Sequence, residues 1–211
     1  MPLAFKWGSD IPIAGQGFDE WVDSLKRIDS SSNFLIFQSH YFRDEAESIE
    51  KSKELGNRRM ARMINYLGLT KEKTMFETIA EDVQADVRSY PFKAVTYEVI
   101  SVEDVLKSSG DTMEVCFPLK DSLSLPHRSF EGVEKWLNQQ EDKKSDTIFL
   151  TGIADGTGIS ESADVAWERA NVIKEKVMRH GWNDQLIIIN TGQRNQSMPV
   201  RNRCVLIYFN E

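Results

Sequence analysis

Hydrophobic residues recur along this chain in two periodicities, and the same order of patterns occurs in both halves. Residues 18–25 and 130–137 each place apolar side chains at the spacing of a helix that buries one face. The two segments match at three positions, where Phe18, Trp21 and Leu25 correspond to Phe130, Val133 and Leu137. A short strand-like run precedes each predicted helix, at 3–5 and at 115–119. The chain therefore contains an internal repeat, which sets the architecture.

The remaining elements of each half also follow one order. A polar turn leads into an apolar strand, an amphipathic helix follows and ends near Gly68 or Gly181, and an apolar strand closes the half. The predicted elements are the strands 33–37 and 147–150, the helices 55–67 and 165–177, and the closing strands 92–100 and 202–209. The closing strands are offset by 110 residues, and the same offset relates Arg59 to Arg169.

Two β-α-β-α-β copies of roughly 100 residues each are long enough for two small domains. The predicted fold class is α/β, in the form of a two-layer α+β sandwich in each domain, with helices packed on one face of a sheet. We expect the domains to span residues 1–107 and 111–211. Ser108–Asp111 is the expected joint, because it combines small polar residues with a glycine between two predicted strands.

The charge balance argues against nucleic acid and anionic membranes as partners. The 211 residues carry a net charge of -7. Residues 1–107 contribute -4 (14 basic against 18 acidic) and the rest -3 (12 against 15), so neither half is basic. Without a basic half or a Lys/Arg block, the chain lacks the electrostatic attraction that draws proteins to polyanions.

The sequence contains no predicted transmembrane segment. The longest apolar run, at 186–189, is far too short to cross a bilayer. The first six residues lack the basic and apolar regions of a signal peptide. We therefore expect a soluble chain whose export signal or anchor, if it is exported, is not in this sequence.

The two cysteines leave the redox state open. Cys116 and Cys204 lie 88 positions apart in the sequence, both within predicted strands. Small apolar core residues with reduced thiols are the favoured interpretation, and a disulfide is the alternative.

Three short motifs in the second half occur in the order and at the spacing of a known domain. Residues 151–158 read Thr-Gly-Ile-Ala-Asp-Gly-Thr-Gly, residues 165–170 read Val-Ala-Trp-Glu-Arg-Ala, and Asn202-Arg203 precedes the closing strand. Residues 113–211 thus resemble the OmpA-like C-terminal domain of Gram-negative envelopes, a family that includes the peptidoglycan-associated lipoprotein and the stator protein of the flagellar motor. In that family a strand ends in Gly-His-Thr-Asp, a helix opens with Leu-Ser-x-x-Arg-Ala, and the last strand opens with Asn-Arg-Arg. Residues 1–107 resemble a degenerate copy of the same domain.

The resemblance implies non-catalytic binding of peptidoglycan through its diaminopimelate side chain, in the periplasm and at the cell wall or outer membrane. It places the family's aspartate on Asp155 and its helix arginine on Arg169, for the ammonium and the carboxylate of that side chain. It also implies supporting contacts from residues of the loop and of the closing motif, namely Thr157, Gly158, Asn202 and Arg203. It implies no cofactor, and it adds other envelope proteins as further partners.

Departures from the family pattern support an alternative. Ile153 and Ala154 replace the usual His-Thr, and Val165-Ala166 replaces Leu-Ser. A pocket without those hydroxyl and imidazole partners would bind more weakly. The alternative function is therefore a scaffold or interaction module of an envelope complex that has lost peptidoglycan binding.

The first copy keeps little of the binding pattern. Tyr41 stands at the aspartate position, Phe92-Lys93 replaces the Asn-Arg of the closing motif, and Arg59 alone matches. We expect no paired receptor for a zwitterion there, although Asp44 or Glu45 could enter from the longer loop. A packing or partner-docking role is the expected one for this half.

Metal binding and catalysis find no support in the sequence. The three histidines, His40, His127 and His180, are scattered and have no partners at metal-ligand spacing. No Gly-x-Ser-x-Gly elbow accompanies the serines. An enzyme is therefore the least favoured of the three functional classes.

Overall fold

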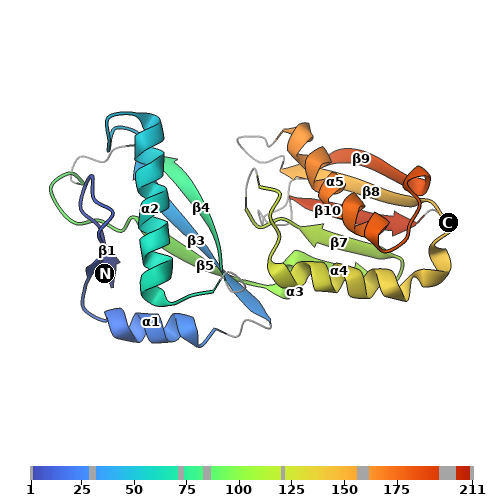
Figure 1. Cartoon of the computed structure of the whole chain (residues 1–211), viewed down its shortest axis with the longest axis horizontal. Helices are drawn as coiled ribbons and strands as arrows, with labels where there is room; N and C mark the ends of the chain where they lie inside the picture. Colours follow the sequence, from blue (N-terminus) through green and yellow to red (C-terminus); the bar gives the residue numbers. More distant parts are fainter. Residues whose placement is uncertain are drawn as a thin grey trace. The chain divides into compact units, whose positions relative to one another are not determined.

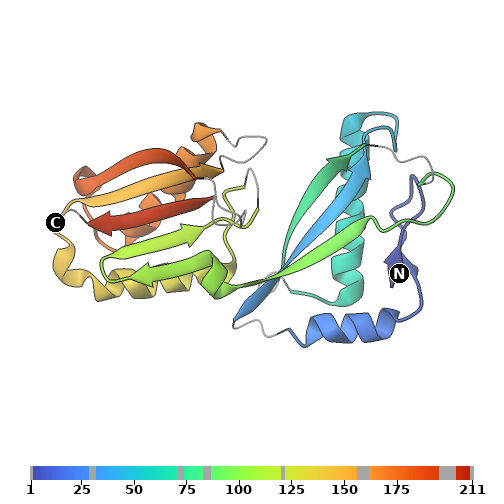
Figure 2. The same cartoon turned by 180° about the vertical axis from the view of Figure 1, so that it is seen from behind.

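The computed structural model describes residues 2–28, 32–70, 74–82, 87–119, 122–155, 162–194 and 203–209. The chain divides into two compact units, residues 1–100 and 101–211, which we name unit 1 and unit 2 (Figure 1). Each unit contains its own hydrophobic core. Both are mixed α/β structures in which helices cover one face of a sheet, as Figure 2 shows from behind.

Unit 1 is built around a three-stranded sheet in the order β4-β3-β5. Its elements are β1 (Leu3–Ala4), β2 (Ile13–Ala14), α1 (Phe18–Lys26), β3 (Asn33–Phe42), α2 (Ile49–Leu67), β4 (Thr74–Glu81) and β5 (Val95–Ser101). β3 and β4 are parallel, with Leu35 opposite Thr74 and Phe42 opposite Glu81. Parallel neighbours need a crossover connection, which α2 supplies while packing against both strands.

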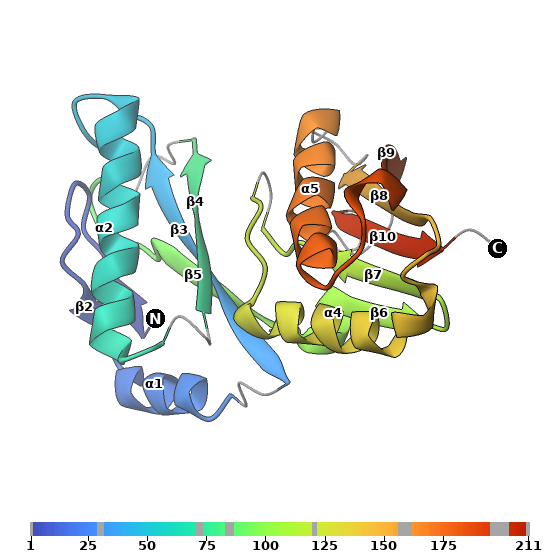
Figure 3. The same cartoon turned by 45° about the vertical axis from the view of Figure 1, so that its right-hand side comes forward.

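Unit 2 is built on a five-stranded sheet in the order β6-β7-β10-β8-β9. Its elements are α3 (Val102–Val105), β6 (Leu106–Ser109), β7 (Thr112–Cys116), α4 (His127–Gln139), the 3-10 turn η1 (Glu141–Lys143), β8 (Ile148–Asp155), α5 (Ala163–Arg179), the 3-10 turn η2 (Asp184–Leu186), β9 (Ile187–Arg194) and β10 (Cys204–Phe209). β8 and β9 are parallel, and β10 is antiparallel to both β7 and β8. In this unit α4 lies along β6 and β7 and α5 along β8 and β9 (Figure 3).

The two long helices of the parallel crossovers begin at polar caps. The Ser48 hydroxyl accepts a hydrogen bond from the Lys51 N–H at 3.2 Å, and the Ser162 hydroxyl accepts one from Val165 at 3.3 Å. α2 and α5 therefore start at Ile49 and Ala163, before the predicted starts at 55 and 165, because these serine caps set where the helices begin. No helix in the described parts of the chain is both long and apolar enough to cross a membrane.

The predicted fold class is confirmed, and the structure adds two strands in each unit that the sequence did not predict: β2 and β4 in unit 1, and β6 and β9 in unit 2. β4 and β9 each pair in parallel with the strand before the crossover helix, and both lie at a sheet edge. Neither β4 nor β9 shows a regular two-residue alternation of apolar and polar residues, which is the sequence signal of a half-buried strand. In β9, Ile187 is buried and Ile188 is exposed, although both are apolar.

The joint between the units lies elsewhere than expected. Ser108–Asp111 is the turn of the β6-β7 hairpin, with Ser109 paired to Thr112 and Gly110 at a φ of 55°. Small polar residues with a glycine are typical of tight turns as well as of linkers. The sequence pattern therefore could not distinguish a hairpin turn from the expected joint between domains. The chain instead passes between the units at Ile100 and Ser101, where β5 leads directly into α3.

Cys116 and Cys204 form a disulfide, so the favoured expectation of two reduced thiols is wrong. They are directly opposite each other on β7 and β10, and both are completely buried. Strand register, which the sequence separation of 88 does not reveal, brings them together. The disulfide connects the end of β7 to the start of β10.

Removing this disulfide is expected to destabilise unit 2 by about 2–5 kcal/mol, because the link closes a long loop and restricts the unfolded chain. The double substitution Cys116→Ala/Cys204→Ala, and wild type in reductant, should both unfold at lower denaturant concentration. Chemical unfolding followed by fluorescence measures the effect, and reductant should leave the double variant unchanged. An identical midpoint for wild type with and without reductant would contradict the assignment.

Candidate functional site

Two buried arginines define the candidate sites. Arg59 in α2 and Arg169 in α5 are both 0% exposed, and each lies on the helix that connects the parallel strands of its unit. A guanidinium stays charged under all ordinary conditions, and burying a charge is costly unless it is paired and hydrogen-bonded. The groups around each arginine therefore indicate what the site is arranged to hold.

In unit 2, the segment that follows β7 fixes the orientation of Arg169. Its Nε donates to the Ser122 carbonyl at 3.0 Å, and its Nη2 donates to the Leu119 carbonyl at 3.2 Å. The guanidinium carbon lies 5.1 Å from the ring centroid of Phe117, which is also buried. Two carbonyls and an aromatic ring thus hold the cation in one orientation.

The strand register brings the predicted motifs of unit 2 to one end of the sheet. Val205 of β10 is opposite Val115 of β7 and Gly152 of β8. The end of β7, the end of β8 at Asp155 and the residue before β10, Arg203, therefore lie at the same edge. The Arg203 carbonyl accepts a hydrogen bond from the Phe117 N–H at 2.7 Å, which links the closing motif to the ring beside Arg169.

Several predicted site residues fall outside the described residues. Thr157, Gly158 and Asn202 are among these, and of Asp155 only the backbone is described, at the last position of β8 and opposite Arg194. Arg203 is described and partly buried. The predicted roles of these residues as ligand contacts stay predictions.

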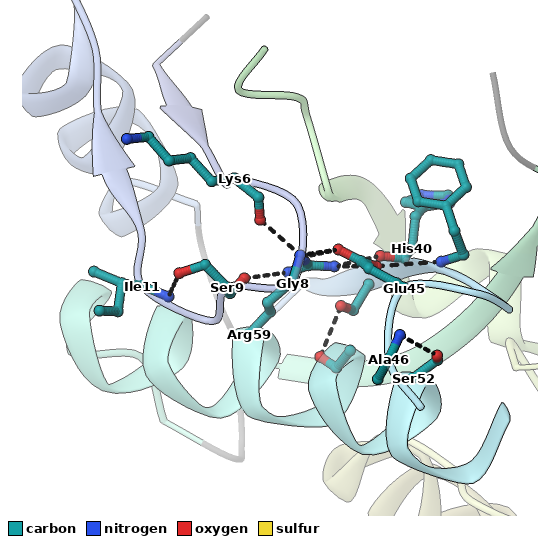
Figure 4. A network of polar contacts seen from close by, with 12 residues as sticks. Lys6, Gly8, Ser9, Ile11, His40, Glu45, Ala46, Ser52 and Arg59 are labelled. Atoms are coloured by element: carbon teal, nitrogen blue, oxygen red, sulfur yellow. Dashed lines mark hydrogen bonds and ion pairs between the residues drawn. The ribbon is translucent and has the colours of Figure 1, made fainter. Parts of the chain in front are cut away.

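In unit 1, the corresponding arginine is described in full (Figure 4). Arg59 Nε donates to the Ser9 carbonyl at 2.9 Å, and Nη2 donates to the Lys6 carbonyl at 3.2 Å. The rings of Phe5 and Phe92 lie 5.5 and 5.1 Å from its guanidinium carbon. The environment of Arg59 therefore resembles that of Arg169.

The Glu45 carboxylate binds the outer edge of the Arg59 guanidinium through both oxygens. Oε2 accepts from Nη1 at 2.9 Å, and Oε1 accepts from Nη2. Two backbone N–H groups complete the set, that of Gly8 to Oε1 at 3.1 Å and that of Phe42 to Oε2 at 3.3 Å. Both side chains are 0% exposed, so this is a buried, bidentate ion pair.

The two arginines are held by the same atoms in the same pattern. In each, Nε donates to a serine carbonyl, Ser9 or Ser122, and Nη2 donates to the carbonyl three positions earlier, Lys6 or Leu119. Those carbonyls follow β1 in unit 1 and β7 in unit 2. The shared geometry extends the sequence correspondence of Arg59 and Arg169 to the level of individual hydrogen bonds.

A second shared feature lies one helical turn before each arginine. In unit 2, a Cβ on Gly152 of β8 would lie 2.0 Å from the Ala166 carbonyl oxygen, so only glycine allows α5 to lie this close. In unit 1, the Ser39 hydroxyl of β3 donates to the Gly56 carbonyl of α2 at 2.8 Å. Each helix therefore contacts its strand through the carbonyl three positions before the arginine.

Unit 1 has an aromatic strand end where unit 2 has the motif aspartate. Tyr41 and Phe42 are both buried, whereas Lys93 is exposed. Of the two acidic residues that the sequence offered as partners for Arg59, the structure selects Glu45. Asp44 forms an exposed ion pair with Arg88 instead.

The described residues include one cluster with the composition of a metal site, formed by Glu114, Cys116 and Cys204. Both of its cysteines belong to the disulfide and supply no thiolate. Zinc and other soft-metal sites depend on such thiolates, so this cluster is not a candidate metal centre.

No family model and no curated protein matches the chain. About half of the chain is similar in structure to OmpA-like and related periplasmic domains. The periplasmic domain of Helicobacter pylori MotB aligns at 16% identity and a TM-score of 0.40, over 50% of this chain and 80% of that one. The OmpA-like domain of FopA1 from Francisella tularensis aligns at 17% identity and 0.37, over 50% and 80%. The peptidoglycan-associated lipoprotein from Burkholderia pseudomallei aligns at 16% identity and 0.39, over 46% and 89%.

Breaking the Arg59–Glu45 pair from either side is expected to destabilise unit 1 by about 3–5 kcal/mol, because one buried charge is left uncompensated. Arg59→Met and Glu45→Gln test this singly. The double variant Arg59→Met/Glu45→Gln should lose less free energy of unfolding than the two single variants lose together. A double-mutant cycle of denaturant unfolding measures the difference.

The matched control for this cycle is Arg58→Met, one position earlier on the same helix. Arg58 is exposed and lies 3.4 Å from Asp10, so its loss should change the stability by no more than about 1 kcal/mol. Additive effects of Arg59→Met and Glu45→Gln would contradict the assigned pair.

Proposed function

We propose that unit 2 is a non-catalytic, OmpA-like peptidoglycan-binding module that holds the diaminopimelate side chain and anchors an envelope protein to the cell wall in the Gram-negative periplasm. The observation that carries the proposal is the buried Arg169 guanidinium. Two backbone carbonyls and the Phe117 ring hold it at the end of the sheet where β8 terminates. The family motif supports the proposal by assigning a ligand role to Arg169 and to Asp155, the last residue of β8.

The proposed ligand presents an ammonium and a carboxylate on one carbon atom. A planar guanidinium takes a carboxylate through two parallel hydrogen bonds, and an aspartate takes the ammonium. Arg169 and Asp155 have these roles in the proposal. In the proposal, Thr157, Gly158, Asn202 and Arg203 make supporting contacts to the ligand.

Unit 1 provides an internal precedent for the carboxylate contact. Its arginine has the same two carbonyl contacts and binds the Glu45 carboxylate in bidentate geometry. The orientation that both arginines share is thus compatible with a carboxylate bound to the guanidinium. This supports a carboxylate as the group that Arg169 recognises, with unit 1 as a degenerate copy of the same domain.

The disulfide of unit 2 supports the proposed location. Disulfides persist in oxidising compartments such as the bacterial periplasm and are rare in reducing cytosol. Cys116 and Cys204 pair within the buried core of the proposed binding unit. A chain that depends on this link is suited to the envelope.

The expected affinity is modest for a single site. Each satisfied charged contact contributes about 1.5–3 kcal/mol, and association costs offset much of the sum. Two or three such contacts give roughly micromolar binding. A polymeric wall then raises the effective concentration of ligand and strengthens retention.

One observation favours the alternative, an envelope scaffold that has lost the ligand. Ile153 and Ala154, which replace the family's His-Thr, are 6% and 1% exposed. Apolar side chains have thus taken two positions where the family has polar groups. The pocket of unit 2 would then contain fewer hydrogen-bond partners than a typical member of the family.

Sedimentation with insoluble peptidoglycan tests the proposal. Asp155→Asn and Arg169→Lys should each weaken binding about ten- to a hundredfold, because each removes one charge-assisted contact. Circular dichroism of each variant checks that it is folded.

Matched controls lie on the same helix. Asp164→Asn and Arg179→Lys make the same two side-chain changes at exposed positions of α5, and the ion pair described for Arg179 is with Glu175, at 3.6 Å. Both should sediment like wild type. Wild-type binding by both Asp155→Asn and Arg169→Lys would rule out the assigned site, whereas a wild-type protein that does not sediment would favour the scaffold function.

A competition experiment identifies the recognised group. Free diaminopimelate should displace the protein from peptidoglycan, whereas 1,5-diaminopentane, which has both ammonium groups but no carboxylate, should not. The difference arises because the diamine offers the Arg169 guanidinium no carboxylate. Equal competition by the two compounds would contradict a role for Arg169 in carboxylate recognition.

A further inference from the structure

The carboxylate of Glu45 lies in a complete receptor formed by other parts of unit 1. Each oxygen accepts one guanidinium N–H and one backbone N–H, from Arg59 with Gly8 for Oε1 and from Arg59 with Phe42 for Oε2. The donors come from α2, from the segment after β1 and from the end of β3. Such convergence on both oxygens is typical of a binding site for a carboxylate ligand.

Glu45 enters this receptor from the loop between β3 and α2. In unit 2, the corresponding loop lies between β8 and α5 and follows Asp155 in the sequence. The loop that supplies Glu45 in unit 1 therefore corresponds to the loop that follows Asp155 in unit 2. The Glu45 side chain contacts Arg59 within the same unit and is completely buried.

We propose that unit 1 retains a carboxylate-binding site and that Glu45 is its permanent internal ligand. The arginine, the two backbone amides and the two carbonyls that orient the arginine form the receptor. The Glu45 side chain occupies it and excludes external carboxylates, including those of peptidoglycan. This inference rests on the geometry of unit 1 alone, so a failure of peptidoglycan binding by unit 2 would leave it intact.

The proposal predicts which external ligand fits when the internal one is removed. Glu45→Ala deletes the Cγ methylene and the carboxylate, which together correspond to one acetate ion. Acetate is therefore the probe of matching size and charge. Glu45→Gly deletes the Cβ as well, and propionate is then the matching ion.

The test is made on the full chain carrying Glu45→Ala. Acetate should stabilise this variant in a saturable way, and at ten times its dissociation constant it should lower the unfolding equilibrium constant about elevenfold. Sodium chloride at the same ionic strength should not reproduce the effect. If the variant is unfolded in buffer alone, acetate should restore folding, so the experiment remains decisive.

Nuclear magnetic resonance gives a second readout at the donors themselves. The amide resonances of Gly8 and Phe42 should shift on acetate addition to Glu45→Ala and stay constant in wild type, where Glu45 already occupies both N–H groups. The double variant Glu45→Ala/Arg59→Met should show neither shift nor stabilisation, because the guanidinium is gone.

Two results with the variants, and one with wild type, would overturn the proposal. One is a Glu45→Ala protein whose stability does not respond to acetate beyond the chloride control. The other is an equal acetate response in the variant that also lacks Arg59. Wild type that binds acetate at Gly8 and Phe42 would equally show that Glu45 does not occupy the site.

Discussion

The central physical constraint in this protein is the burial of an arginine on the crossover helix of each unit. Arg59 and Arg169 are both 0% exposed, and a cation at that depth must be compensated from every side. Backbone carbonyls after the first strand take the inner N–H groups, and aromatic rings lie within about 5–6 Å of the charge. The positions of strand ends, helix and loop in each unit follow from satisfying that one group.

The two units differ in the loop that leads into the crossover helix, between β3 and α2 in unit 1 and between β8 and α5 in unit 2. In unit 1, this connection supplies Glu45, and the carboxylate that balances Arg59 is part of the chain. In unit 2, it follows Asp155 and begins with the sequence Gly-Thr-Gly. The two units thus differ in this connection, while both have a buried arginine, its two carbonyl contacts and a close helix–strand approach.

The sequence predicts the parts of this arrangement that depend on local periodicity. The helices at Phe18–Lys26 and His127–Gln139 follow from apolar spacing, and the sequence already related Arg59 to Arg169 by the offset of the closing strands. The sequence did not reveal β4 and β9, because neither has a regular alternation of apolar and polar residues. It also could not pair Cys116 with Cys204, since register is a property of three-dimensional pairing. Glu45 was one of two acidic residues within reach of Arg59, and only the structure distinguishes it from Asp44.

The most direct test of the account follows the guanidinium resonances of both arginines while diaminopimelate is added to the wild-type protein. Nitrogen-detected or side-chain proton spectra can resolve Arg59 and Arg169 separately, with the lysine variants providing the assignments. The account predicts that the Arg169 resonances shift to saturation and that those of Arg59, already bound to Glu45, do not move. Unchanged Arg169 resonances, or a shift at Arg59 alone, would contradict it.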